Sequence, residues 1–153
     1  MATDPISYDR QELKAITKSF KAMDDEAVDQ AKQKSSALAS FVQSSIIDSA
    51  ASVRRGQSVA LRIATGSTVS KSSKIGEISF GFARQKFSGG ATTQQLWGGS
   101  EFGSNRYKQF PQWSGRYNNG SRGWWIYPEL RRIQPEIVQR WNEGFSQIVK
   151  KFN

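Results

Sequence analysis

The chain has 153 residues and a formal net charge of +9, and this length favours a single domain spanning 1–153. It contains no cysteine and no histidine, which excludes disulfides and thiolate chemistry and removes both the usual general base and the commonest metal ligand. It has no run of eighteen apolar residues and no basic-then-apolar N-terminus, so we expect no membrane span and no secretory signal.

The first part of the chain, 1–55, is predicted to form two helices. Asp9 and Glu12 fit a capping box, and apolar residues follow at spacings of three and four, as on one face of an amphipathic helix. Asp24 fits the N-cap of a second helix, predicted from about 25 to about 53. The apolar stripe of this second helix is rich in Ala and Ser, so we expect it to pack against a neighbour through small residues.

The middle of the chain, 57–127, is predicted to form a small antiparallel sheet with a long aromatic loop at 104–123. Val59, Leu61 and Ile63 alternate with Ala and Arg, which is typical of a half-buried strand. The expected elements are a strand at 59–63, a polar turn at 65–74, a strand at 75–82, a mobile connection at 85–95 and a short strand at 96–103.

The C-terminal part, 128–153, is predicted to be a helix. Apolar residues recur at spacings of three and four from Leu130 to Phe152. Pro135 disfavours a helix interior, so we expect a short turn at 128–133 and a main helix from about 135. This helix is expected to pack on one face of the sheet, which makes the predicted fold class α+β. The expected core residues near it are Trp124, Ile126, Ile137 and Trp141.

The sequence holds no recognisable catalytic arrangement. Glu77 and Glu101 could face one another across strands as an acid–base pair, but two solvated carboxylates are the favoured interpretation. A helix cap explains the acidic residues at 24–29 better than a calcium loop does. No phosphate-binding glycine loop and no serine nucleophile motif is present. We therefore expect no enzyme, and no catalytic residue, cofactor, metal site or small-molecule ligand.

Aromatic and basic residues are concentrated in the second half of the chain. Residues 97–127 hold nine of the eighteen aromatic residues together with four Arg or Lys, and residues 51–153 hold sixteen Lys/Arg against five Asp/Glu. Such a segment suits a nucleic-acid surface, where rings stack on bases and cations meet phosphates. It also suits a protein interface anchored by rings and Arg, or a loop folded back over its own sheet. Composition alone slightly favours the loop folded back over its own sheet, although loops this long are uncommon unless they serve a function.

Three short motifs follow one another in this segment: Glu101-Phe102-Gly103-Ser104, Phe110-Pro111-Gln112-Trp113, and Trp124 to Arg132 leading into the Glu136–Phe152 helix. Together with the N-terminal helical pair and the small sheet, this order resembles the minor tail-component family of long-tailed double-stranded DNA phages. These are the small neck or tail-completion proteins of such phages. The specific part of the resemblance covers about 97–140, and the long 104–123 loop departs from the family pattern.

The resemblance implies a structural virion protein that forms a sixfold or twelvefold ring at the head–tail junction. Such a ring joins the head connector or stopper to the tail tube, or terminates the tube, and it is assembled in the host cytoplasm. We therefore expect a homo-oligomer, with passing double-stranded DNA as a further contact. The expected subunit interface is Tyr107, Phe110, Trp113, Arg116 and Tyr117. Contacts with DNA or an acidic partner are expected at Arg54, Arg55, Arg106, Lys108 and Arg122.

The alternative function is a basic, aromatic module that binds single-stranded nucleic acid, and a third reading is an adaptor domain unrelated to virions. A nucleic-acid-binding module is expected to bind oligonucleotides with an affinity that falls steeply as salt rises. A ring subunit is expected to associate with itself or with neighbouring virion proteins instead.

Overall fold

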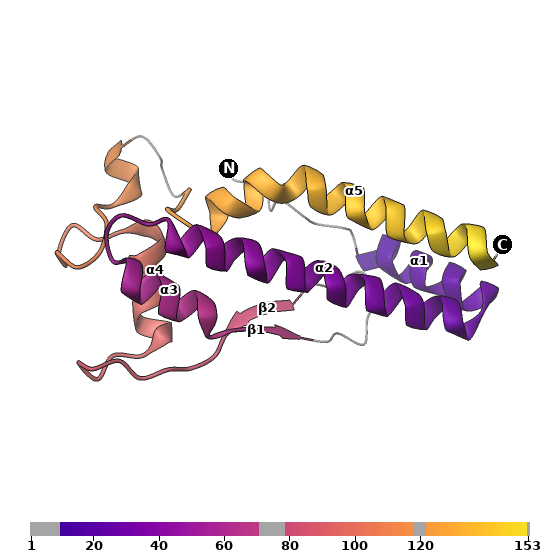
Figure 1. The fold of residues 1–153 in the computed structure, drawn as a ribbon, viewed down its shortest axis with the longest axis horizontal. Coiled ribbons are helices and arrows are strands. Elements are labelled where there is room, and N and C mark those ends of the chain that lie inside the picture. The colour runs from indigo at the N-terminus through magenta and orange to yellow at the C-terminus, as the bar shows by residue number, and fades with distance from the viewer. Residues whose placement is uncertain (1–9, 71–78, 118–121, 153) are drawn as a thin grey trace.

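Two long helices form the body of the molecule. The structure is a computed structural model that describes residues 10–70, 79–117 and 122–152. Helices α2 (Asp25–Ala51) and α5 (Tyr127–Phe152) lie side by side and antiparallel along the long axis (Figure 1). Their outer ends are joined by a hydrogen bond from Lys34 Nζ to Gln147 Oε1 (3.2 Å) and by the Lys151–Glu26 ion pair (3.5 Å).

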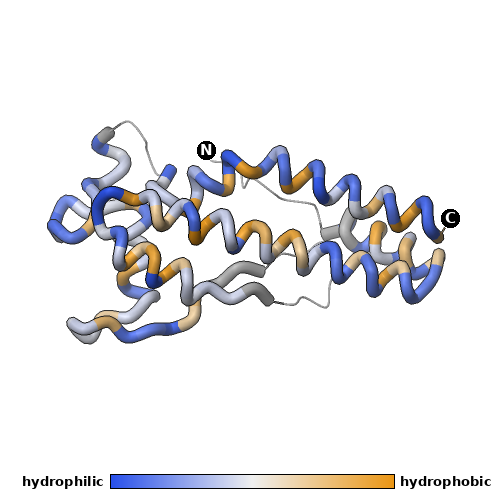
Figure 2. The backbone as a smooth tube through the Cα atoms, viewed as in Figure 1, coloured by the Kyte–Doolittle hydropathy of each residue, from blue (hydrophilic) through white to orange (hydrophobic). Residues whose placement is uncertain are grey.

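The main core lies between α2, α3 (Gln57–Thr65) and the first half of α5. Apolar residues recur along the facing sides of α2 and α5 (Figure 2). Ile46, Ile63, Trp125 and Ile137 are fully buried in this cluster. Burying a large apolar side chain stabilises the folded state by about 1.5–3 kcal/mol, so this cluster holds the three helices together.

A second, smaller cluster attaches α1 (Arg10–Met23) to the outer ends of α2 and α5. Phe20, Ala27, Ala31 and Ile148 are buried there, and the rings of Phe20 and Phe145 meet edge to face, 5.2 Å between centroids. The alanines allow α1 and α5 to approach α2 closely, which agrees with the small-residue packing expected from the sequence.

The predicted second helix is confirmed, and so is its N-cap. The Asp24 carboxylate accepts a hydrogen bond from the Glu26 backbone N–H (2.8 Å). The first helix is also present, although Asp9 and the Glu12 side chain lie outside the described residues. No helix in the described part of the chain is long and apolar enough to cross a bilayer.

The predicted α+β fold class is wrong, because the fold is mainly α-helical. Strands β1 (Ser67–Ser70) and β2 (Ser79–Phe82) form one short antiparallel ladder in which Ser67 pairs with Phe82. This two-stranded ladder lies against α2 and is not the central layer of the fold. Helix α5 packs on α2 and not on a sheet. β1 also falls where only a polar turn was expected.

Two predicted strands are helices. Residues 59–63 lie in α3, where Ala60, Ile63 and Ala64 are the buried residues. Their spacing of three and four is that of a helix, and it competes with the alternation of Val, Leu and Ile in the same segment. Residues 96–103 and most of the expected mobile connection lie in or beside α4 (Thr93–Phe102). Helix α4 begins at a capping box in which the Thr92 backbone N–H donates to Gln95 Oε1 (2.9 Å).

Helix α5 is continuous from Tyr127, so the predicted separation into a turn and a main helix is wrong. Pro135 lies within it as an exposed residue. A proline in a helix interior costs about 3 kcal/mol, and the burial of Ile133 and Ile137 on either side is large enough to offset that cost. Of the expected core residues, Ile126, Ile137 and Trp141 are buried, whereas Trp124 is half-buried and its neighbour Trp125 is fully buried.

Candidate functional site

The three motifs of residues 97–132 meet around one buried carboxylate, that of Glu101. Glu101 lies in the last turn of α4 and has no exposed surface. Its carboxylate accepts hydrogen bonds from the backbone N–H groups of Trp125 (3.3 Å), Ile126 (2.6 Å) and Tyr127 (3.2 Å). The first N–H groups of a helix have no acceptor within it. Glu101 therefore caps α5 from a different helix, and we call this arrangement the Glu101 clamp.

Burial raises the pKa of the Glu101 carboxyl to about 7, although the backbone hydrogen bonds, that of Ile126 first, act to lower it. The expectation of two solvated carboxylates is therefore wrong for Glu101, which is enclosed. Glu77 lies outside the described residues. Both carboxylate oxygens of Glu101 accept hydrogen bonds from the start of α5, and Glu101 lines none of the hollows described below. We therefore infer that Glu101 positions the start of α5.

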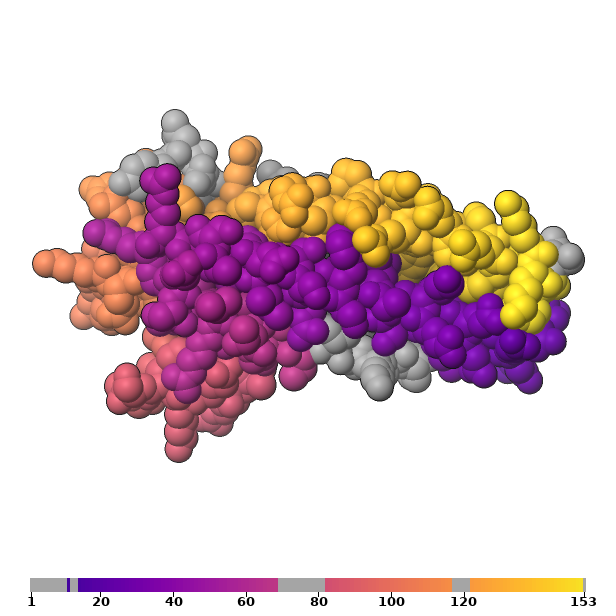
Figure 3. Space-filling model, in the orientation of Figure 1, coloured from indigo at the N-terminus to yellow at the C-terminus, as the bar shows by residue number. Residues whose placement is uncertain are grey.

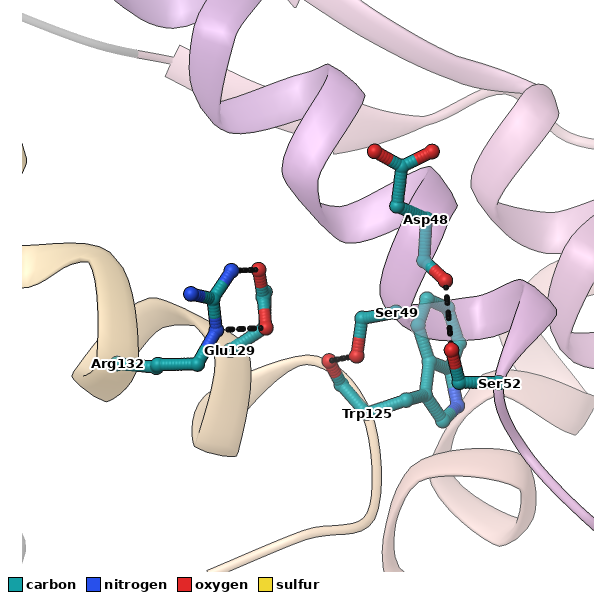
Figure 4. A network of polar contacts seen from close by, with 6 residues as sticks. All are labelled: Asp48, Ser49, Ser52, Trp125, Glu129 and Arg132. Atoms are coloured by element: carbon teal, nitrogen blue, oxygen red, sulfur yellow. Dashed lines mark hydrogen bonds and ion pairs between the residues drawn. The ribbon is translucent and has the colours of Figure 1, made fainter.

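Glycine is required next to this carboxylate. Gly123 has a φ of +84°, and a Cβ added there would lie 1.6 Å from Glu101 Oε1. The clamp extends to α2, because the Ser49 hydroxyl donates to the Trp125 carbonyl (2.8 Å; Figure 4). The Trp125 indole N–H also donates to Ser100 Oγ (3.1 Å). Helices α2, α4 and α5 are thus joined at one end of the molecule.

The residues after Glu101 seat a loop, residues 103–117, on this clamp. Ser104 Oγ accepts from the backbone N–H groups of Arg106 (3.1 Å) and Tyr107 (3.0 Å), and the Ser104 N–H donates to the Pro111 carbonyl (2.8 Å). On the far side of the loop, the Trp124 indole N–H donates to the Gln112 carbonyl (3.0 Å). The loop is closed on itself and held to the start of α5.

The corner between α2 and α3 lies against the same loop. Gly56 has a φ of +67°, and a Cβ added there would lie 2.9 Å from the Gln109 carbonyl oxygen. We call residues 52–56 and 103–117 together the tip. Figure 1 shows it at the end of the molecule opposite α1 and the C-terminus, and Figure 3 shows long side chains projecting from that end.

The structure divides the predicted interface residues into two groups. Phe110 is buried within its own chain, with 4% of its surface exposed and its ring above Gly99. Tyr107 and Trp113 are 53% and 48% exposed, and Arg116 is exposed as well. The Tyr117 side chain lies outside the described part of the chain. In this conformation the rings available to a partner are therefore those of Tyr107 and Trp113.

Four of the five predicted basic contacts gather at the tip. Arg54 and Arg55 are exposed on the corner after α2, and Arg106 and Lys108 are exposed on the loop. Arg122 is exposed beside the clamp, where its carbonyl accepts from Arg131.

Two hollows lie between the corner and the loop, and both are lined by Arg55 and Gln112. The larger, of about 570 Å³, is lined by Ser52, Val53, Arg54, Arg55, Pro111, Gln112 and Trp124. The smaller, of about 90 Å³, is lined by Arg55, Ser104, Asn105, Tyr107, Lys108, Phe110, Gln112 and Arg116. Arg116, predicted as a subunit contact, thus lies beside the predicted polyanion contacts.

Comparison with models of known protein families, with curated proteins and with solved structures found no match to this chain. Within the described ranges, no three acidic side chains come together in a way that could hold a metal ion. Any functional inference therefore depends on the tip and on the resemblance of the three motifs that build it.

Proposed function

We propose that this chain is a subunit of a ring in the neck of a tailed phage particle. The ring joins the head connector to the tail tube as a tail-completion or terminator-like component. Each subunit contacts its neighbour through the tip. The observation that carries this proposal is the exposure of two large rings, Tyr107 and Trp113, on a loop that the Glu101 clamp holds in place.

Exposed aromatic rings on a fixed loop favour a protein contact. A flexible loop would lose conformational freedom on binding, whereas a loop already closed by its own hydrogen bonds loses little. Here the Ser104 hydroxyl fixes the backbone at Tyr107, and the Trp113 indole lies against Gly115. Trp and Tyr are the residue types that most often anchor protein interfaces, and a ring subunit must present surfaces for two neighbours.

The motifs named in the resemblance support the same proposal because they build this loop. Glu101 and the 124–127 segment form the clamp, and Phe110 fixes the loop to α4 above Gly99. The resemblance therefore concerns the residues that hold the tip in its shape. Deletion of the loop would also remove the buried Phe110, so point substitutions give the cleaner test.

The test is the assembly state of the purified full chain, measured by sedimentation velocity over a range of concentrations. The wild type is expected to form a closed oligomer, alone or when mixed with the connector and tail-tube proteins of its phage. The double variant Tyr107→Ala with Trp113→Ala is expected to remain monomeric and folded.

The matched control is Tyr107→Phe with Trp113→Phe, which keeps an aromatic ring at both positions and is expected to keep assembly. A wild type that stays monomeric under every condition would refute the proposal. Assembly of the alanine double variant at the wild-type concentration would show that these rings are not the contact.

A further inference from the structure

We infer that the tip is also a binding surface for the phosphodiester backbone of nucleic acid. The side chains that would meet phosphates are Arg54, Arg55, Lys108 and Arg116, which surround the two adjoining hollows. This inference does not depend on ring formation, because it concerns the charge of a single subunit.

The cations of the tip differ from the arginines of α5 that are held in ion pairs. On α5, Arg132 pairs with Glu129 (2.5 Å; Figure 4) and Arg140 pairs with Glu136 (2.8 Å). None of Arg54, Arg55, Lys108 and Arg116 forms an ion pair with any residue that the structure describes. Their charge is therefore available to an external anion.

The sequence around the tip is almost free of carboxylates. Residues 49–127 contain eleven Lys or Arg but only two acidic residues, Glu77 and Glu101. Glu101 is buried in the clamp, and Glu77 lies in a segment that the structure does not describe. A surface of one sign with no interleaved opposite charge attracts a uniform polyanion.

The cations converge from two separate parts of the chain. Arg55 belongs to the corner after α2, whereas Lys108 and Arg116 belong to the loop, and all three line the same small hollow. The close approach of Gly56 to the Gln109 carbonyl fixes the corner against the loop. The guanidinium groups of Arg55 and Arg116 can each bind a phosphate through two N–H groups. The backbone segments that carry these cations are therefore held against one another before an anion arrives.

The test is fluorescence anisotropy of a labelled short duplex, and of a single strand of equal length, titrated with the full chain at several salt concentrations. Four phosphate contacts predict a slope of about −3.6 for log K against log salt with duplex DNA, and about −2.8 with a single strand. The affinity for the duplex is thus expected to fall by about 150-fold between about 50 and 200 mM salt.

The variant Arg55→Ala with Lys108→Ala removes two of these contacts and is expected to bring the duplex slope close to about −1.8. The matched control, Arg132→Ala with Arg140→Ala, removes the same charge from α5 and is expected to leave the slope unchanged. Equal effects of the two variants would mean that only net charge matters and would overturn the inference. Equally tight binding of polyglutamate, or a flat salt dependence of the wild type, would also overturn it.

Sedimentation of the same samples separates this result from the ring proposal. A chain that binds DNA with the expected slope but stays monomeric, both alone and with the connector and tail-tube proteins, supports the phosphate surface and refutes the ring. Binding of both the duplex and the single strand supports a contact with the phosphodiester backbone. If one form binds more tightly, that form is the better candidate for the natural ligand. A ring without salt-dependent DNA binding overturns this inference and leaves the ring proposal standing.

Discussion

The buried Glu101 carboxyl makes the stability of this protein depend on pH in an unusual direction. Burial raises its pKa from 4.5 to about 7, so the folded state binds this proton more tightly than the unfolded chain does. The stabilisation is complete below the unfolded pKa of 4.5 and is lost as the pH rises through about 7. The protein should therefore become less stable between mildly acidic and mildly alkaline pH.

The size of the effect follows from the same shift. One pKa unit corresponds to about 1.4 kcal/mol, and integrating the linkage relation from about pH 5 to about pH 8 gives a loss of about 2–3 kcal/mol. The chain has no histidine, and no other side chain with an ordinary pKa titrates in this interval. The pH dependence therefore reports mainly on Glu101.

Urea unfolding of the wild type and of Glu101→Gln at several pH values across this range measures the effect. The wild-type free energy of unfolding is expected to fall by about 2–3 kcal/mol, whereas the variant, which cannot ionise, is expected to show a nearly flat profile. The amide oxygen of glutamine still accepts from the start of α5, so the variant is expected to fold. A wild-type profile that is flat or rises with pH, or a variant that follows the wild type, would refute the reasoning.

Two glycine pairs test the packing around the same end of the molecule. Gly98→Ala is expected to raise the free energy of unfolding by about 0.5–1 kcal/mol, because a Cβ at Gly98 would meet nothing within 4 Å. Gly99→Ala is expected to lower the free energy of unfolding, because a Cβ at Gly99 would lie 2.9 Å from the Phe110 ring. Thermal unfolding of both variants compares them, and effects of the same sign would contradict the position of Phe110. Gly123→Ala should cost more than about 2 kcal/mol, since its Cβ would collide with the Glu101 carboxylate. Gly89→Ala, with open space around it, should change stability by less than about 0.5 kcal/mol, and similar losses in the two variants would count against the clamp.

The long helices could be predicted because their signals are local and repeated. Asp24 marks the start of α2. Apolar residues recur along α5 at spacings of three and four from Leu130 to Phe152. The continuity of α5 across Pro135, in contrast, depends on tertiary packing and not on local helix propensity. Burial on both sides of Pro135 keeps α5 continuous, although proline propensity alone predicts a break.

Strand β2 lies within the predicted strand 75–82, but the other two predicted strands are helices because competing signals fit them. Residues 59–63 match a strand by alternation and a helix by the burial of Ala60, Ile63 and Ala64. For α4, residues 96–103 were predicted as a short strand, whereas the capping box at Thr92 and Gln95 indicates a helix start. The second signal was present in the sequence and was the more specific of the two.

The aromatic loop was predictable as a feature, but its contacts were not. The content of aromatic rings and cations indicated an interaction segment. Arg55 and Lys108 line the same hollow but are far apart in the chain, so no local sequence pattern reveals that they lie close together. Glu101 had one indirect signal. The start of α5 has Ile126 before its first residue, and isoleucine has no side-chain acceptor for the free N–H groups, so a cap from elsewhere was required.

The most direct test of the central claim is electron microscopy of the purified full chain, in negative stain, alone and mixed with the tail tubes of its phage. We expect closed rings of sixfold or twelvefold symmetry in which the loop bearing Tyr107 and Trp113 lies at the contact between neighbouring subunits. Isolated particles of single-subunit size under both conditions would contradict it.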